Sequence, residues 1–182
     1  GLSGELPKGL DIPAVVTVHD LIFYRYPELY KSIDVEIHKR KVNHAVKTAS
    51  KIVAISEQTK ADLIEFTATP AQNIEVIYQG CHPAFKTPYS KKFLNTITKK
   101  YQLPKKFVLF VGTLEARKNA MTIAKGLKDT NHHMVFVGKV KAHGEKLKTY
   151  VKENNMQDRV LFIHHIDIAD LAVSYQTATV VC

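Results

Sequence analysis

The chain has 182 residues, 45% of them hydrophobic, and a formal net charge of +9. This length predicts one large domain or two small ones, with enough apolar side chains for a core. No run of about 18 apolar residues occurs, so we expect no transmembrane helix, and the first residues lack the pattern of a signal peptide. The two cysteines, Cys81 and Cys182, lack metal-ligand spacing and indicate free thiols in a reducing cytosol.

The positive charge is concentrated in the second half of the chain. Residues 1–81 hold 9 Lys and Arg against 10 Asp and Glu, whereas residues 82–182 hold 17 against 7, a net charge of +10. A half with so many cations is typical of a protein that binds nucleotide phosphates, nucleic acid or an anionic membrane. The alternative is that these lysines lie solvated on helix exteriors, which is their usual place.

The first half alternates strand and helix patterns. AVVTVHD, after Pro13, predicts a short strand that ends in His19 and Asp20, and the aromatic stretch behind it predicts a loop. The elements expected next are a helix at about 30–50, a strand at 51–55, a helix with Ser56 as N-cap and a strand at 74–80. The apolar stripe of the first of these helices includes Ile33 and Ile37, which are therefore expected on its buried face. Open α/β sheets bind ligands beyond the carboxyl ends of their strands, so His19 and Asp20 are candidate site residues.

Residues 81–106 are rich in proline and lysine, which predicts a connection between two domains. The second half then repeats strand–helix units, whose strands are FVLFVG, HMVFVGK, RVLFIHH and TVVC. Such alternation predicts a parallel, doubly wound sheet with right-handed crossovers. We therefore expect an α/β fold with two parallel-sheet domains, residues 1–81 and residues 82–182.

The stretch 107–119, FVLFVGTLEARKN, combines a buried strand, a glycine turn, a cationic loop and a helix start. The strand ends at Gly112, the loop carries Arg117 and Lys118, and Asn119 is the expected helix N-cap. Strand carboxyl ends and helix N-termini both favour anions, so this stretch predicts a phosphate site. A surface connection with solvated basic residues would fit the spacing equally well.

The same stretch resembles the motif that opens the C-terminal domain of retaining glycosyltransferases of family 4. These enzymes have the GT-B fold, in which two Rossmann-like domains face each other. The resemblance continues through VVTVHDLIFYRYPE, IVAISEQTKADL and IEVIYQG in the first half. It implies that Gly112, Arg117 and Lys118 bind the diphosphate of a nucleotide-sugar donor, and that His19 and Asp20 are catalytic.

Further residues have weaker assignments. Gly138 and Lys139 end the strand that follows Lys118 and are expected at the same sheet edge as a nucleotide-binding pair. The resemblance places Ile166 in a loop that lines the nucleobase pocket, although a core role fits this residue almost as well. Thr113 stands where some family members carry another arginine, so that contact is absent or is supplied elsewhere.

The resemblance also implies a reaction. A hexose of the mannose or glucose type would pass from a donor such as GDP-mannose or UDP-glucose to a glycan or lipid-linked acceptor, with retention of configuration. No cofactor and no metal are implied, and the expected location is the cytoplasm, with peripheral contact at the cytoplasmic membrane face as an option. The family's Gly-rich acceptor loop and Glu-x7-Glu motif do not occur in this sequence, so we expect both domains to be incomplete and the fragment to be inactive by itself.

Two other functions are alternatives to a transferase. A GT-B sugar-nucleotide epimerase shares the fold but is not expected to carry the G-T-L-E-x-R-K-N loop. The basic second half suggests a nucleic-acid-binding module, whose signature would be exposed aromatics among basic residues or a recognisable reading motif. Neither feature appears, so no nucleic-acid partner is expected.

Overall fold

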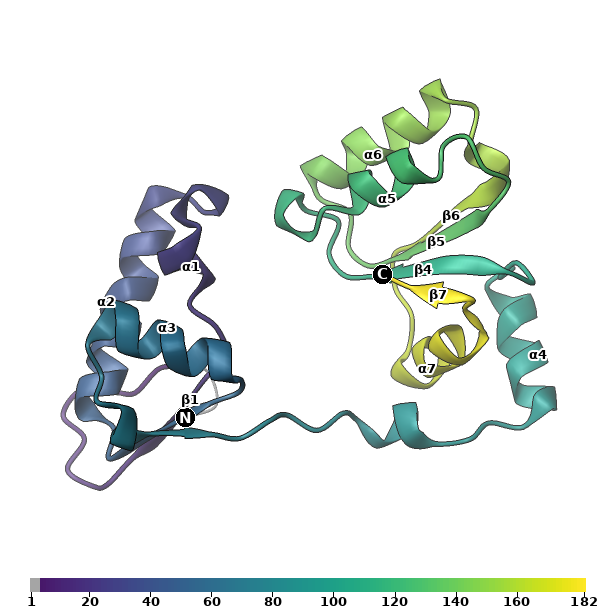
Figure 1. The fold of residues 1–182 in the computed structure, drawn as a ribbon. Helices are drawn as coiled ribbons and strands as arrows, with labels where there is room; N and C mark the ends of the chain where they lie inside the picture. The colour runs from purple at the N-terminus through teal and green to yellow at the C-terminus, as the bar shows by residue number, and fades with distance from the viewer. Residues whose placement is uncertain (1–3) are drawn as a thin grey trace. The chain divides into compact units, whose positions relative to one another are not determined.

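The computed structural model describes residues 4–182, which form two compact units that divide between Gly80 and Cys81. Each unit has its own parallel sheet with its own hydrophobic core (Figure 1). The α/β class with parallel sheets is therefore confirmed. None of the helices within residues 4–182 has the length and apolar character needed to cross a membrane.

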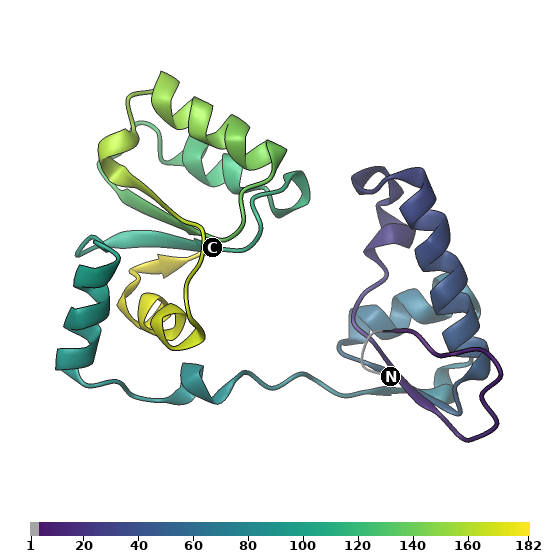
Figure 2. The ribbon, with the colours of Figure 1, turned by 180° about the vertical axis from the view of Figure 1, so that it is seen from behind.

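The first unit is a three-stranded sheet in the order β1-β2-β3 with helices packed on it (Figure 2). Its elements are β1 (Val15–Val18), α1 (Ile22–Arg25), α2 (Ser32–Thr48), β2 (Lys51–Ala54), α3 (Glu57–Thr67) and β3 (Ile74–Val76). Alternate strand residues such as Val16, Val18 and Ile52 are buried, and they pack with Ala45 of α2 and Leu63 of α3. Ser56 caps α3 as predicted, because its hydroxyl accepts a 3.1 Å hydrogen bond from the Thr59 amide.

Three expectations for the first unit were wrong in detail. The stretch after Asp20 is helix α1 and a 3₁₀ turn rather than a loop. The last strand stops at Val76, because β2 ends opposite it and the chain from Ser56 onward turns into α3. On α2, Ile33 and Ile37 are exposed, although the spacing of apolar residues predicted both on the buried face.

The second unit is a four-stranded sheet in the order β6-β5-β4-β7. Its elements are α4 (Lys91–Lys100), β4 (Phe107–Val111), α5 (Ala120–Gly126), β5 (His133–Val137), α6 (Ala142–Glu153), β6 (Val160–Ile163), α7 (Ile168–Thr177) and β7 (Val180–Val181). Helices α5 and α6 cover one face, and α4 and α7 cover the other (Figure 1). This is the doubly wound arrangement that the alternating pattern predicted.

A buried carboxylate joins the two helices on one face of the second sheet. Asp170 of α7, only 6% exposed, accepts hydrogen bonds from the Lys100 ammonium at 2.6 Å and the Tyr101 hydroxyl at 2.9 Å. The bond to Asp170 raises the pKa of Lys100 above its ordinary value, so this ammonium stays charged. The contact holds α4, the first α-helix of the second unit, against α7.

We expect Asp170→Ala to lower the melting temperature of the second unit by about 5–10 °C, since one change removes both bonds. Scanning calorimetry of the 182-residue chain measures the shift. Asp129→Ala removes an exposed carboxylate of the same unit that has no ion pair among residues 4–182, and it should leave the transition in place. Equal melting temperatures for Asp170→Ala and the parent chain would show that the contact does not hold the helices together.

Candidate functional site

Two loops lie side by side at the carboxyl edge of the second sheet. One follows β4 and the other follows β5, and they continue the pairing of the strands beyond the sheet. The Gly112 amide donates to the Val137 carbonyl at 2.9 Å, and the Leu114 amide donates to the Lys139 carbonyl at 2.9 Å. Leu114 and Val140 then form an isolated parallel bridge. The backbone of both loops is thus fixed by the sheet.

Glycines permit this close approach of the two loops. Gly138 has a φ of +146°, and a Cβ there would lie 2.2 Å from the Gly112 carbonyl oxygen. Gly112 has a φ of +154°, which also favours glycine. A Cβ on Gly144 of α6 would lie 2.8 Å from the Leu114 Cβ, so the helix packs directly on the loops. Gly112 and Gly138 therefore shape the backbone of the predicted site.

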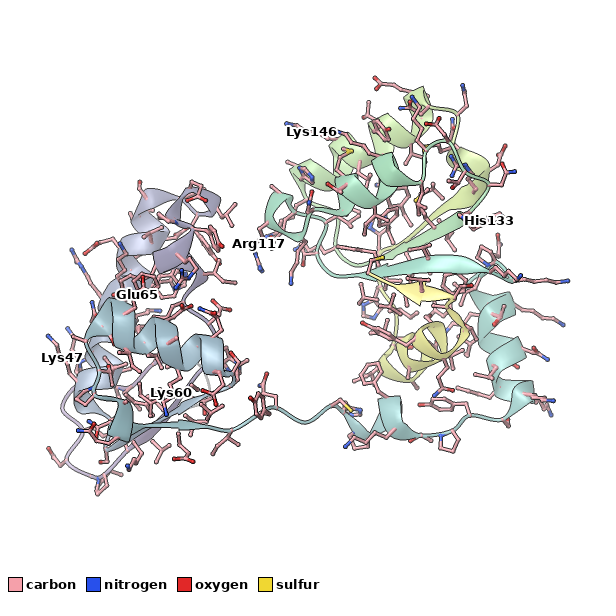
Figure 3. All side chains as sticks on the ribbon, viewed as in Figure 1. Lys47, Lys60, Glu65, Arg117, His133 and Lys146 are labelled. Atoms are coloured by element: carbon pink, nitrogen blue, oxygen red, sulfur yellow. The ribbon has the colours of Figure 1, made fainter. Side chains whose placement is uncertain are left out.

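The two loops present cations at this edge. Arg117 and Lys118 lie in the 3₁₀ turn Ala116–Lys118 behind β4, and both are exposed. Figure 3 shows Arg117 projecting from this loop. Lys139, also exposed, follows Gly138 on the neighbouring loop. The structure therefore places on adjoining loops the cations that the sequence assigned to the phosphate and nucleotide.

Glu115 links the two loops, and the sequence prediction gave it no role. Its carboxylate is 2.7 Å from Arg117 Nε and 2.8 Å from Lys141 Nζ, with 20% of the side chain exposed. The bond from Lys141, helped by the charge of Arg117, holds the pKa of Glu115 below its ordinary value of 4.5. The β4–β5 register pairs each residue with one 26 positions later, and 26 positions also separate Glu115 from Lys141. The sequence pattern alone does not set this register, so it gave no signal for the contact.

Asn119 does not cap α5 in the expected way. Its φ of 52° is left-handed, and its side chain accepts from the Thr122 hydroxyl at 2.8 Å instead of from a backbone amide. Helix α5 begins at Ala120 as predicted, but it has only seven residues. The positive character of this edge therefore comes from side chains on the loops.

The strand order also favours this edge as the binding site. The chain leaves β4 toward β5 on one side and returns to β7 on the other, so the order reverses at β4. Parallel sheets bind ligands beyond the carboxyl ends of the strands at such a reversal. Ile166, in the loop after β6, is partly buried against the apolar cluster on the α4–α7 face. That packing supports a core role, and its nucleobase role stays a prediction.

A cavity of about 770 Å³ lies at the opposite, amino edge of the same sheet. Lys105, Lys106, His133 and Arg159 line it, and Figure 3 labels His133 at that edge. The guanidinium of Arg159 is already engaged there, because it donates to backbone carbonyls, including that of Leu127 at 3.0 Å. Parallel sheets bind ligands at their carboxyl edge, so we keep the carboxyl edge as the candidate site despite the cavity at the amino edge.

In the first unit, His19 and Asp20 follow β1 at its carboxyl end, as predicted, and both are exposed. The His19 carbonyl accepts the Thr59 hydroxyl of α3 at 3.0 Å. The Asp20 carboxylate accepts the Ile22 amide at 3.2 Å and so begins α1. Both residues line a cavity of about 520 Å³.

A charged network that the sequence did not indicate borders this cavity. Arg25 of α1 donates from Nε and Nη2 to Asp62 of α3, at 3.2 and 2.6 Å, and from Nη2 to Glu65 at 2.9 Å. Gln58 also donates to Asp62 at 2.7 Å. The bond from Arg25 to Asp62 raises the pKa of Arg25 above its ordinary value. The network fastens α1, which follows His19, to α3.

No cluster of three or more His, Cys, Asp or Glu side chains suited to a metal ion is found in the part of the chain that the structure describes. Each unit thus has its predicted site residues at the carboxyl edge of its own sheet. The first offers an imidazole and carboxylates, and the second offers cations on a fixed backbone.

Comparisons with known proteins agree with this architecture. Sucrose-phosphate synthase from Thermosynechococcus elongatus superposes with a TM-score of 0.77 at 22% identity, over 96% of this chain and 45% of that one. Anabaena HepE in complex with UDP and glucose superposes with a TM-score of 0.73 at 18% identity, over 93% and 45%. The fold is therefore the GT-B type of glycosyltransferases.

Sequence comparison shows which family of glycosyltransferases the chain resembles. Residues 2–85 match the sequence model of Glycosyltransferase Family 4. O-antigen chain mannosyltransferase B from Escherichia coli is 28% identical over 120 residues, which are 65% of this chain and 31% of that protein. The predicted resemblance to family 4 glycosyltransferases is confirmed. The chain spans less than half the length of these relatives.

Proposed function

We propose that this chain is part of a glycosyltransferase that moves a hexose from a nucleotide-diphospho-sugar to a glycan or lipid-linked acceptor, with retention of configuration. The observation that carries the proposal is the pair of glycine-locked loops that present Arg117, Lys118 and Lys139 at the carboxyl edge of β4 and β5. A diphosphate is the part of the donor that such an array of cations matches.

Each cation has a definite part in this proposal. Arg117 and Lys118 bind the diphosphate and offset the negative charge that grows on it as the bond to the sugar breaks. Lys139 adds positive charge from the second loop. Because these groups are held by a rigid backbone, they need little rearrangement during the reaction.

The first unit has its own candidate site residues. His19 is the proposed catalytic group for the hexose, and Asp20 fixes the backbone after His19 by accepting the Ile22 amide at the start of α1. The cavity next to them is lined by Tyr26, Gln58 and Asp62 among others, which are side chains suited to sugar hydroxyls. No cofactor or metal is required for this scheme.

The relatives limit the choice of donor. The Escherichia coli relative is a mannosyltransferase, which favours GDP-mannose, whereas the HepE structures contain UDP or UDP-glucose. The acceptor is a glycan or lipid-linked sugar, and peripheral contact with the membrane would accompany a lipid-linked one.

Binding measurements on the full-length protein test this proposal. Calorimetry should show saturable binding of GDP or UDP, weakened at least tenfold in Lys118→Ala, since one charge-assisted contact to phosphate is lost. A random oligonucleotide is the comparison ligand, measured at about 50 and 200 mM salt. Tighter binding of the oligonucleotide, with a steep salt dependence, would instead support a nucleic-acid-binding protein.

A further inference from the structure

We propose that Glu115 is a positioning residue that sets Arg117 and Lys141 for contact with the donor diphosphate, which makes Lys141 a further cation of the site. The proposal rests on the donor-binding function proposed above for these two loops. Lys141 was not among the predicted site residues. Glu115 carries a negative charge, which by itself would repel a phosphate, so it is not a residue type expected in a phosphate site.

The contacts of Glu115 join the two loops through their side chains. One carboxylate oxygen forms an ion pair with Arg117 Nε, on the loop after β4, and the other accepts a hydrogen bond from Lys141, on the loop after β5. Only 20% of the Glu115 side chain is exposed, whereas 56% of Lys141 is exposed. The carboxylate therefore lies beneath the cations, where its bonds are less screened than those of surface ion pairs.

The bonding pattern leaves the cations free to bind a ligand. Arg117 uses Nε for Glu115, and a guanidinium has four more N–H groups, on Nη1 and Nη2. Lys141 uses one of its three ammonium protons for Glu115. Within residues 4–182 neither cation has another ion pair. The terminal fork of an arginine is the part that binds phosphate oxygens in a bidentate way.

Two explanations of Glu115 predict opposite signs of effect. A carboxylate that serves only as a neighbouring negative charge repels a diphosphate, so its removal should tighten binding. A carboxylate that orients two cations should, when removed, weaken binding, because the side chains lose their fixed geometry. The sign of the change therefore separates an orienting group from a counterion.

The test compares Glu115→Gln, Glu115→Asp and the control Glu145→Gln in the full-length protein. Calorimetry gives the dissociation constants for GDP and UDP, and steady-state kinetics gives kcat and KM. Glu115→Gln should weaken diphosphate binding about tenfold and also lower kcat. Glu115→Asp keeps the charge and should recover part of both. Glu145→Gln removes an exposed carboxylate of α6 that pairs with Lys148, and it should change neither.

The Lys141→Met background adds a second criterion. If Glu115 acts partly by holding Lys141, Glu115→Gln should cost less in this background than in the parent protein, so the effects are not additive. Additive effects would refute the link to Lys141. Melting temperatures of all variants show whether the loops remain folded, and Glu115→Asp supplies the comparison if Glu115→Gln does not fold.

The outcomes for this inference and for the proposed function can be told apart. If Glu115→Gln binds GDP or UDP as tightly as the parent or more tightly, while Lys118→Ala binds weakly, Glu115 is only a counterion and the inference is wrong. The donor site would stand in that case. If the parent protein binds neither nucleoside diphosphate, both proposals fail together.

Discussion

Lys118→Ala is expected to lower kcat of the full-length enzyme by roughly two orders of magnitude, the scale for loss of one preorganised charge-stabilising group. The leaving diphosphate carries more negative charge in the transition state than in the bound donor. An interaction that strengthens in this way affects turnover as well as affinity, so kcat and kcat/KM should fall together. Steady-state kinetics with the preferred nucleotide sugar measures both.

The neighbouring cations provide the comparison for Lys118. Arg117→Ala should act in the same direction and leave Glu115 bound to Lys141 alone. Lys125 lies on the exposed side of α5, beyond the cationic loop, so Lys125→Ala should have almost no kinetic effect. Wild-type turnover in Lys118→Ala would refute a role of this loop in stabilising the leaving group.

The sequence predicts those parts of the fold that depend on local pattern. The apolar run from Phe107 to Val111 is a central strand of the second sheet, and Ser56 caps α3 through its hydroxyl. Both features depend on a few adjacent side chains. The doubly wound order also followed from alternating strands and helices, because right-handed crossovers leave few other arrangements.

The features that escaped prediction depend on tertiary contacts. Helix α1 begins where Asp20 accepts the Ile22 amide and is fastened by Arg25 to a distant helix, so its apolar spacing alone does not reveal it. Ile33 shows the opposite error. The apolar spacing along α2 predicted that this side chain is buried, but it is exposed. Neither outcome is fixed by residues close in sequence.

In the candidate site, too, the residues that follow strand ends were predictable from the sequence, whereas the tertiary contacts were not. Arg117, Lys118 and Lys139 were found from their positions after strand ends, and the structure places them on adjoining loops. The contact between Glu115 and Lys141 required the register of β4 and β5, which the hydrophobic pattern alone does not set. The roles of His19 and Asp20 toward a sugar remain predictions, as do those of the three cations toward a phosphate.

Gly138→Ala is expected to destabilise the second unit by about 3–5 kcal/mol, because the new Cβ combines overpacking with an unfavourable backbone conformation. That Cβ would lie 2.2 Å from the Gly112 carbonyl oxygen and 2.7 Å from the carbonyl carbon. Both are backbone atoms, so no side chain can move aside. Urea unfolding of the 182-residue chain, followed by circular dichroism, measures the change in free energy.

Two other glycines of the same unit serve as controls for Gly138→Ala. Gly112 has a φ of +154°, but a Cβ there would meet only ring atoms of Phe110 at 3.8 Å. Gly112→Ala should therefore be destabilised only by the unfavourable backbone conformation, without a steric clash. Gly126 ends α5 with no atom within 4 Å of a Cβ, and Gly126→Ala should be neutral or stabilise by up to about 1 kcal/mol. Substitution by Ala is therefore expected to destabilise the unit most at Gly138, less at Gly112 and least at Gly126. If Gly138→Ala were as stable as Gly126→Ala, the two loops would not be locked together, and the fixed placement of the cations proposed for donor binding would lose its support.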